Sequence, residues 1–163
     1  MKKTVSKNIL IVMLIAAAGI IVEFWTMLHA GIKEQVRLSE LSDKHLSLYL
    51  LLNQWFKTKQ EGKALAEYFH KNGIKSIAIY GMSYLGERLY TELRNSDIEI
   101  KYAIDKRSGK ACAGLQTFSP DEDLPEVGAI VITAVFYFDE IKSSIEGKTV
   151  ARIISLEDIL YEI

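Results

Sequence analysis

Two consecutive stretches decide the fold: Ser76-Ile-Ala-Ile-Tyr-Gly-Met-Ser-Tyr-Leu-Gly86, and after it Ile98-Glu-Ile-Lys-Tyr-Ala-Ile-Asp105. Together they predict a strand, a glycine turn, a helix, a second strand and an acidic residue at the end of that strand. A short apolar strand that leads into a helix through a glycine turn leaves backbone N–H groups at the positive end of the helix dipole, where a phosphate can bind. The acid that ends the next strand has the position of a ribose-binding residue.

The same alternation of strands and helices continues to the C-terminus. We expect five strands, at residues 74–80, 98–105, 115–118, 127–133 and 151–154. The expected helices cover residues 85–93, a brief segment opened by Ser119 and closed by Pro125, residues 138–146, and a final helix capped by Ser155. Such alternation predicts an α/β domain: a doubly wound, Rossmann-like parallel sheet with helices on both faces and the strand order 3-2-1-4-5.

Ligands of such sheets bind at the carboxyl ends of the strands, where the strand order reverses, here between the first and fourth strands. Three loops should meet there, and they supply the candidate cofactor-binding residues: Gly81, Met82, Ser83, Leu85, Gly86, Asp105, Lys106, Thr133 and Ala134. Gly81 permits the tight turn, and Gly86 permits close packing of the helix on the sheet. NAD or NADP is the possible cofactor.

Two features of this pattern leave alternatives open. Ser83 stands where the dinucleotide fingerprint has its close-approach glycine, which keeps the backbone further from a pyrophosphate, although the hydroxyl can donate to a phosphate. Asp105 follows Gly86 by about twenty residues, the spacing of the ribose-binding acid. Asp105 equally suits a strand-end turn, and glycine turns also occur in doubly wound domains that bind no nucleotide.

The N-terminus carries an apolar segment, residues 9–28, preceded by Lys2, Lys3 and Lys7. Its twenty residues match the hydrocarbon core of a bilayer, about 30 Å thick, so we expect residues 1–30 to be a single-pass membrane anchor. A signal peptide cleaved near residue 18 and a buried helix are the alternatives. Lysine and arginine are balanced on the two sides, so orientation is not predicted. We expect a cytoplasmic soluble domain, since nucleotide cofactors are cytosolic.

Residues 31–72 predict a helical collar between this anchor and a Rossmann-like nucleotide-binding domain at residues 73–163. Within the collar, one helix is expected at residues 38–56, because apolar residues recur there at steps of three or four, and a second is expected at residues 63–70. This apolar face suits core packing or self-association, so a homodimer is one possible assembly.

Composition narrows the function further. The net charge of -1 gives no reason to expect a nucleic-acid partner. Cys112 is the single cysteine, so neither a disulfide framework nor a cysteine-built metal site is expected. No metal-ligand or catalytic constellation stands out. The one Tyr-x-x-x-Lys spacing, Tyr102 to Lys106, lies on a strand and its turn, where the two side chains cannot share a helical face.

Four motifs carry a resemblance to a known family: Leu52-Asn-Gln-Trp-Phe-Lys-Thr-Lys-Gln-Glu-Gly62, Ile77-Ala-Ile-Tyr-Gly-Met82, Tyr102-Ala-Ile-Asp-Lys106 and Ile153-Ile-Ser-Leu-Glu-Asp-Ile159. The chain from about residue 52 onward resembles the Rossmann-like domains of bacterial capsular and surface polysaccharide proteins, described as nucleoside-diphosphate-sugar epimerase-like. The resemblance implies a nucleotide or nucleotide-sugar binding fold in surface-glycan assembly. The anchor, the partial fingerprint and the missing catalytic residues favour a membrane-anchored, non-catalytic binding module that presents its ligand to a glycan-assembly partner. One alternative is a minimal NAD(P)-dependent epimerase or oxidoreductase subunit completed by a partner, with Thr133 and Tyr137 as suspected groups. The other is a structural adaptor with an empty cleft.

Overall fold

The structure is a computed structural model that describes residues 2–106 and 114–163. For residues 2–12, 14–17 and 21 it describes the helical backbone only. The chain forms two compact units, residues 1–47 and residues 48–163, and each is described by itself. Cys112, discussed above from its sequence context, lies outside the described residues.

A single helix, α1 (Lys2–Gln60), accounts for the N-terminal part of the chain. The helix expected at residues 38–56 is therefore the end of a longer helix rather than a separate element. The reason lies in the sequence: both prolines come after residue 119, and an isolated glycine such as Gly31 costs a helix only about 1 kcal/mol. α1 ends just before Gly62, whose φ of 75° suits a residue that follows a helix.

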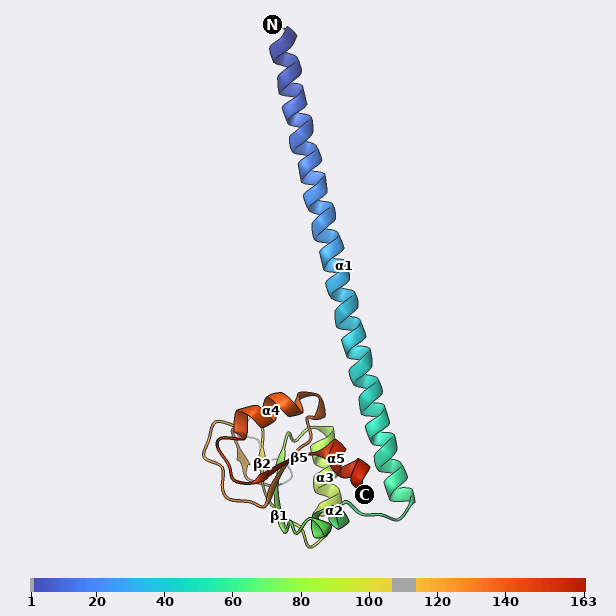
Figure 1. Ribbon diagram of the computed structural model, residues 1–163, viewed down its shortest axis with the longest axis vertical. Coiled ribbons are helices and arrows are strands. Elements are labelled where there is room, and N and C mark those ends of the chain that lie inside the picture. The colour runs from blue at the N-terminus through green and yellow to red at the C-terminus, as the bar shows by residue number, and fades with distance from the viewer. Residues whose placement is uncertain (1, 107–113) are drawn as a thin grey trace. The chain divides into compact units, whose positions relative to one another are not determined.

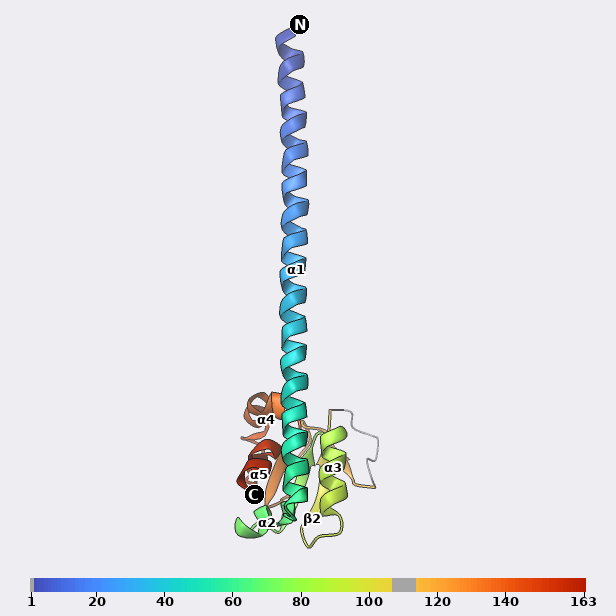
Figure 2. The same ribbon diagram turned by 90° about the vertical axis from the view of Figure 1, so that its right-hand side faces the viewer.

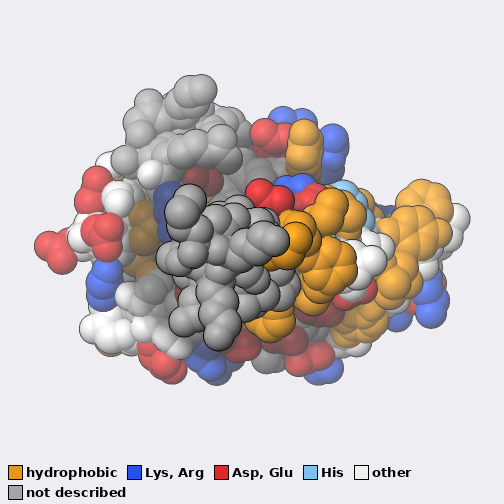
Figure 3. All heavy atoms as spheres, turned by 90° about the horizontal axis from the view of Figure 1, so that it is seen from above, with side chains coloured by type: hydrophobic (Ala, Val, Ile, Leu, Met, Phe, Trp, Pro, Cys, Tyr) orange, Lys and Arg blue, Asp and Glu red, His pale blue; other side chains and the backbone are white. Residues whose placement is uncertain are grey.

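Large apolar side chains of α1 are exposed in the first unit. Phe24, Trp25 and Met27 are exposed by 61%, 63% and 72%, and hydrophobic side chains are visible among the surface atoms in Figure 3. Among the residues that the structure describes, no helix meets both the length and the apolarity needed to span a membrane.

The second unit is built on a five-stranded sheet whose neighbouring strands are all parallel (Figure 1). Its strands are β1 (Ser76–Tyr80), β2 (Glu99–Ile104), β3 (Thr117–Phe118), β4 (Ala129–Ile132) and β5 (Arg152–Ser155). Their order is β3-β2-β1-β4-β5, so the predicted order is confirmed. Tyr80 at the end of β1 pairs with Ile104 on one side and Ile132 on the other. The three strands therefore end level, and the loops that follow them share one edge of the sheet.

Helices cover both faces of this sheet, as predicted. α2 (Leu65–Lys71), α3 (Tyr84–Leu93), α5 (Leu156–Glu162) and the last turns of α1 pack on one face (Figure 2). The short 3-10 helix η1 (Val135–Tyr137) leads into α4 (Phe138–Ile145), which packs on the other face. Strand β1 serves both cores, because Ile77 and Ile79 face the first set of helices whereas Ala78 and Tyr80 face α4.

The brief helix predicted between Ser119 and Pro125 is wrong, because the structure has only a turn there. The backbone N–H of Asp121 does donate to the Ser119 hydroxyl, at 3.4 Å, and the N–H of Glu122 donates to the Ser119 carbonyl at 3.1 Å. The helix does not continue, because Pro125 has no N–H and disfavours helical geometry in the residue before it. Ser119 therefore makes hydrogen bonds typical of a helix N-cap, although no helix follows it.

Glu92 on α3 joins the end of α1 to α2. Its carboxylate accepts hydrogen bonds from the indole Nε1 of Trp55 at 2.7 Å, from Nζ of Lys59 at 2.8 Å and from the backbone N–H of Leu65 at 3.1 Å. Trp55 and Leu65 are themselves buried in the core of the second unit. The last turns of α1 are therefore an integral part of this folded unit.

Candidate ligand-binding site

The turn after β1 is held by both neighbouring strands. Gly81 has a φ of 91°, and its N–H donates to the carbonyl of Ile104 at 2.8 Å. On the other side, the N–H of Thr133 donates to the carbonyl of Tyr80 at 3.0 Å, and the Thr133 hydroxyl donates to the carbonyl of Gly81. Thr133 is 1% exposed. Its hydroxyl therefore fixes the turn and does not face a ligand.

Gly86 lies so close to the backbone of the glycine turn that no side chain fits between them. A Cβ at this position would lie 2.2 Å from the carbonyl oxygen of Gly81, far inside van der Waals contact. At Gly81 itself, a Cβ would lie 3.1 Å from Oγ1 of Thr133 in a backbone conformation that favours glycine. The two glycines thus let α3 begin directly against the turn, and this requirement exists whether or not a ligand binds.

Ser83 is the N-terminal capping residue of α3, but its side chain makes no capping hydrogen bond. The residue is exposed and extended, with φ -88° and ψ -163°. Tyr84, the first residue of the helix, is 83% exposed. Because the first N–H groups of a helix have no partner within it, this end of α3 offers donors at the positive end of the helix dipole.

Asp105 is tied to the glycine turn. One of its carboxylate oxygens accepts a hydrogen bond from the backbone N–H of Met82 at 3.1 Å, and its own N–H donates to the carbonyl of Phe118 at 3.0 Å. The acid therefore has the strand-end role that the sequence left open. It also lines the cleft described next, so a contact with a ligand remains compatible with this role.

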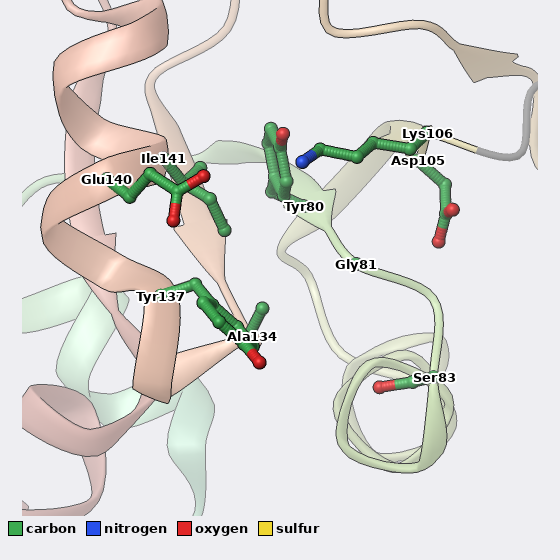
Figure 4. Close-up of a pocket in the computed structure, with 9 residues that line it drawn as sticks. All are labelled: Tyr80, Gly81, Ser83, Asp105, Lys106, Ala134, Tyr137, Glu140 and Ile141. Atoms are coloured by element: carbon green, nitrogen blue, oxygen red, sulfur yellow. The ribbon is translucent and has the colours of Figure 1, made fainter. Parts of the chain in front are cut away.

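A cleft of about 410 Å³ opens at this edge of the sheet, where the strand order reverses between β1 and β4 (Figure 4). We call it the switch-point cleft. The predicted site residues that line it are Gly81, Ser83, Asp105, Lys106 and Ala134. The others do not line it; they are buried beneath the turn, namely Met82, Leu85, Gly86 and Thr133.

Four lining residues were absent from the predicted set: Tyr80, Tyr137, Glu140 and Ile141. Tyr137 was suspected only as a catalytic group, and it lies half exposed at the end of η1, just before α4. The position of Tyr80, the last residue of β1, could have been predicted from the sequence, because it follows Ile79 in the strand and must face the opposite side of the sheet. The positions of Glu140 and Ile141 could not have been predicted in this way, because they depend on how α4 packs against the sheet.

Tyr80 is buried, 4% exposed, and its ring stands beside the Lys106 side chain in Figure 4. Burial raises the pKa of its hydroxyl, and the nearby carboxylates of Asp105, Asp121 and Glu140 raise it further. Tyr80 is therefore a neutral phenol at physiological pH.

The structure does not bring the Tyr102 and Lys106 side chains together at this edge of the sheet. Tyr102 donates its hydroxyl to the carbonyl of Pro125 at 2.6 Å and does not line the cleft, so it does not pair with Lys106. Within residues 2–106 and 114–163, no cluster of His, Cys, Asp and Glu could hold a metal ion.

No family model, curated protein or solved structure matches the chain. The fold and the site define its second unit as a parallel α/β domain with a ligand-sized cleft at the reversal of its strand order.

Proposed function

We propose that the chain is a non-catalytic binding module for a nucleotide or nucleotide-sugar. The switch-point cleft carries this proposal: it lies where open parallel sheets bind their ligands, and its volume of about 410 Å³ is within the range of small-molecule sites. Its lining combines a glycine turn, a helix N-terminus, a lysine and carboxylates.

Each part of such a ligand has a matching group. A phosphate would accept hydrogen bonds from the first N–H groups of α3 and from the Ser83 hydroxyl, with the ammonium of Lys106 as counter-charge. The carboxylates of Asp105 and Glu140 repel phosphate but accept hydrogen bonds from ribose or sugar hydroxyls. The exposed ring of Tyr137 offers a face for a base. NAD and NADP stay within this ligand class.

The cellular setting is part of the same proposal. The apolar character of residues 9–28 supports a membrane anchor. The sequence motifs from about residue 52 onward, which resemble those of polysaccharide-assembly domains, motivate a role in making bacterial surface glycans. The module would then present its ligand to a glycan-assembly partner or to a second copy of the chain.

Titration calorimetry of the full chain in detergent tests the binding claim, with UDP, UDP-glucose, NAD and NADP as the titrants. We expect binding of at least one of them, and Lys106→Ala should weaken it at least about fivefold, because a charge-assisted hydrogen bond is lost. Lys75→Ala is the matched control, since Lys75 is also an exposed lysine but precedes β1 at the opposite end of that strand. Absence of heat with every titrant, or equal weakening by both variants, would contradict the proposal.

A further inference from the structure

A second hollow adjoins the switch-point cleft. It has a volume of about 260 Å³ and shares four lining residues with the cleft: Tyr80, Lys106, Glu140 and Ile141. The turn at residues 119–121 and Ser144 of α4 complete it. We call it the side hollow. Because Tyr80 and Lys106 line both spaces, a ligand in the cleft can extend past them into the side hollow.

The hydroxyl of Tyr80 lacks a partner within the described parts of the chain. The residue as a whole is only 4% exposed, but its hydroxyl oxygen is accessible to solvent, because no buried side-chain oxygen of the described residues lacks a hydrogen-bond partner. Tyr102, the other buried tyrosine of this core, donates to the Pro125 carbonyl as buried hydroxyls ordinarily do. The Tyr80 hydroxyl instead opens onto the switch-point cleft and the side hollow, where a ligand can take the place of water as its hydrogen-bond partner.

Donors and acceptors are mixed around this hydroxyl. Lys106 can only donate, whereas the Glu140 carboxylate can only accept. Ser144 donates its hydroxyl hydrogen to the Ile141 carbonyl at 2.7 Å, which leaves its oxygen as an acceptor for the ligand. Ser119 has the opposite arrangement, since its oxygen accepts from the Asp121 N–H at 3.4 Å and its hydrogen remains available. Groups that both donate and accept, such as sugar hydroxyls, satisfy such a lining.

The charges around the side hollow also favour a neutral ligand group over a second phosphate. Carboxylates of Asp121 and Glu140 lie on its lining, and Asp121 is only partly offset by Nζ of Lys148 at 3.4 Å. Lys106 balances Glu140 in the same lining, so the side hollow has no net positive charge to attract a second phosphate, and it offers no helix N-terminus as the switch-point cleft does. The side chains of Pro120 and Ile141 offer apolar surface against which the C–H face of a sugar ring can pack.

We infer that the side hollow binds the sugar ring of a nucleotide-sugar whose phosphates lie in the switch-point cleft, with the Tyr80 hydroxyl hydrogen-bonded to a sugar hydroxyl. This inference rests on the proposed function and specifies its ligand. It distinguishes a nucleotide-sugar from a plain nucleotide.

The test compares a nucleoside diphosphate with its sugar-linked form on the full chain in detergent, by calorimetry with UDP against UDP-glucose and GDP against GDP-mannose. For the pair that binds, the sugar-linked form should bind more tightly. Tyr80→Phe should weaken only the sugar-linked form, by about twofold to tenfold, the range for one neutral hydrogen bond. Its thermal stability should stay near that of the parent chain, because no described residue loses a hydrogen-bond partner.

Tyr102→Phe is the matched control, as it removes a hydroxyl from the same core without touching either space. It should leave both affinities unchanged. If the diphosphates bind but Tyr80→Phe weakens both forms equally or neither, the sugar site is overturned while the proposed function survives. If no member of either pair binds, the sugar site fails, and so does the proposed function unless NAD or NADP binds.

Discussion

Replacement of Gly86 by alanine should destabilise the second unit, although alanine is the better helix former. The new Cβ would lie 2.2 Å from the carbonyl oxygen of Gly81, so α3 or the turn must retreat by roughly 1 Å. The turn cannot yield easily, because the Thr133 hydroxyl holds that same carbonyl. The substitution therefore tests whether the close start of α3 is a real constraint.

The magnitude follows from two opposing effects. Overpacking against fixed backbone costs about 3 kcal/mol, the upper end of the usual range. Replacing glycine by alanine within a helix returns about 1 kcal/mol. The net loss in the free energy of unfolding is about 2 kcal/mol. With a urea m-value of about 2 kcal/mol per molar, the unfolding midpoint should fall by about 1 M.

Urea unfolding followed by circular dichroism and by tryptophan fluorescence measures this change, since Trp55 lies in the core of the second unit. Gly31→Ala is the matched control: it makes the same substitution inside helix α1, where no atom lies within 4 Å of the added Cβ. The control should not lower the midpoint. A Gly86→Ala chain with an unchanged or higher midpoint would refute the packing role of this glycine.

Three further outcomes are expected. Glu92→Ala should lower the free energy of unfolding by about 2 to 4 kcal/mol, because the buried indole N–H of Trp55 and a backbone N–H of α2 lose their acceptor; the exposed Glu87→Ala should change it far less in the same urea assay. Burial raises the pKa of Tyr102 above its unfolded value of about 10, so this residue's contribution to stability is complete below that pH and is lost as the pH rises through the folded pKa. Urea midpoints at pH 9 and pH 11 should therefore differ less for Tyr102→Phe than for the parent chain, and an equal difference would contradict this reasoning. In vesicle flotation, the full chain should float with lipid and Leu14→Lys should reduce the floating fraction, because a lysine within a membrane helix is unfavourable by up to about 3 kcal/mol; a chain that stays at the bottom would exclude the anchor.

The sheet could be predicted because its signals are local. Ile77 and Ile79 alternate with Ala78 and Tyr80 over a length that suits only a strand, and helix-length patterns follow the first strand and the fourth. Strand order then follows from the few topologies open to such alternation. Elements in which two local signals oppose each other were harder to predict. The capping signal at Ser119 predicted a helix, but Pro125 follows too closely for one to form.

The site was predictable to the extent that it depends on short-range spacing. Gly81 and Gly86 act on each other across one turn, so their spacing alone indicates the role that the structure gives them. Thr133 was assigned to the ligand because its loop reaches the same edge, yet its hydroxyl is directed to the turn. Glu140 enters the lining through the docking of α4, which no residue spacing in the chain encodes.

The peptide bond between Gly81 and Met82 is held at both of its polar ends. Its carbonyl accepts from the Thr133 hydroxyl and its N–H donates to Asp105. Such a turn is already ordered before a ligand arrives, so binding should lose little conformational entropy there. The Asp105 carboxylate would also repel a phosphate that approached the Met82 amide, so it would act against ligands that need this amide. If a phosphate binds as proposed, it would therefore approach from the Ser83 side, because the Met82 amide is already occupied by Asp105.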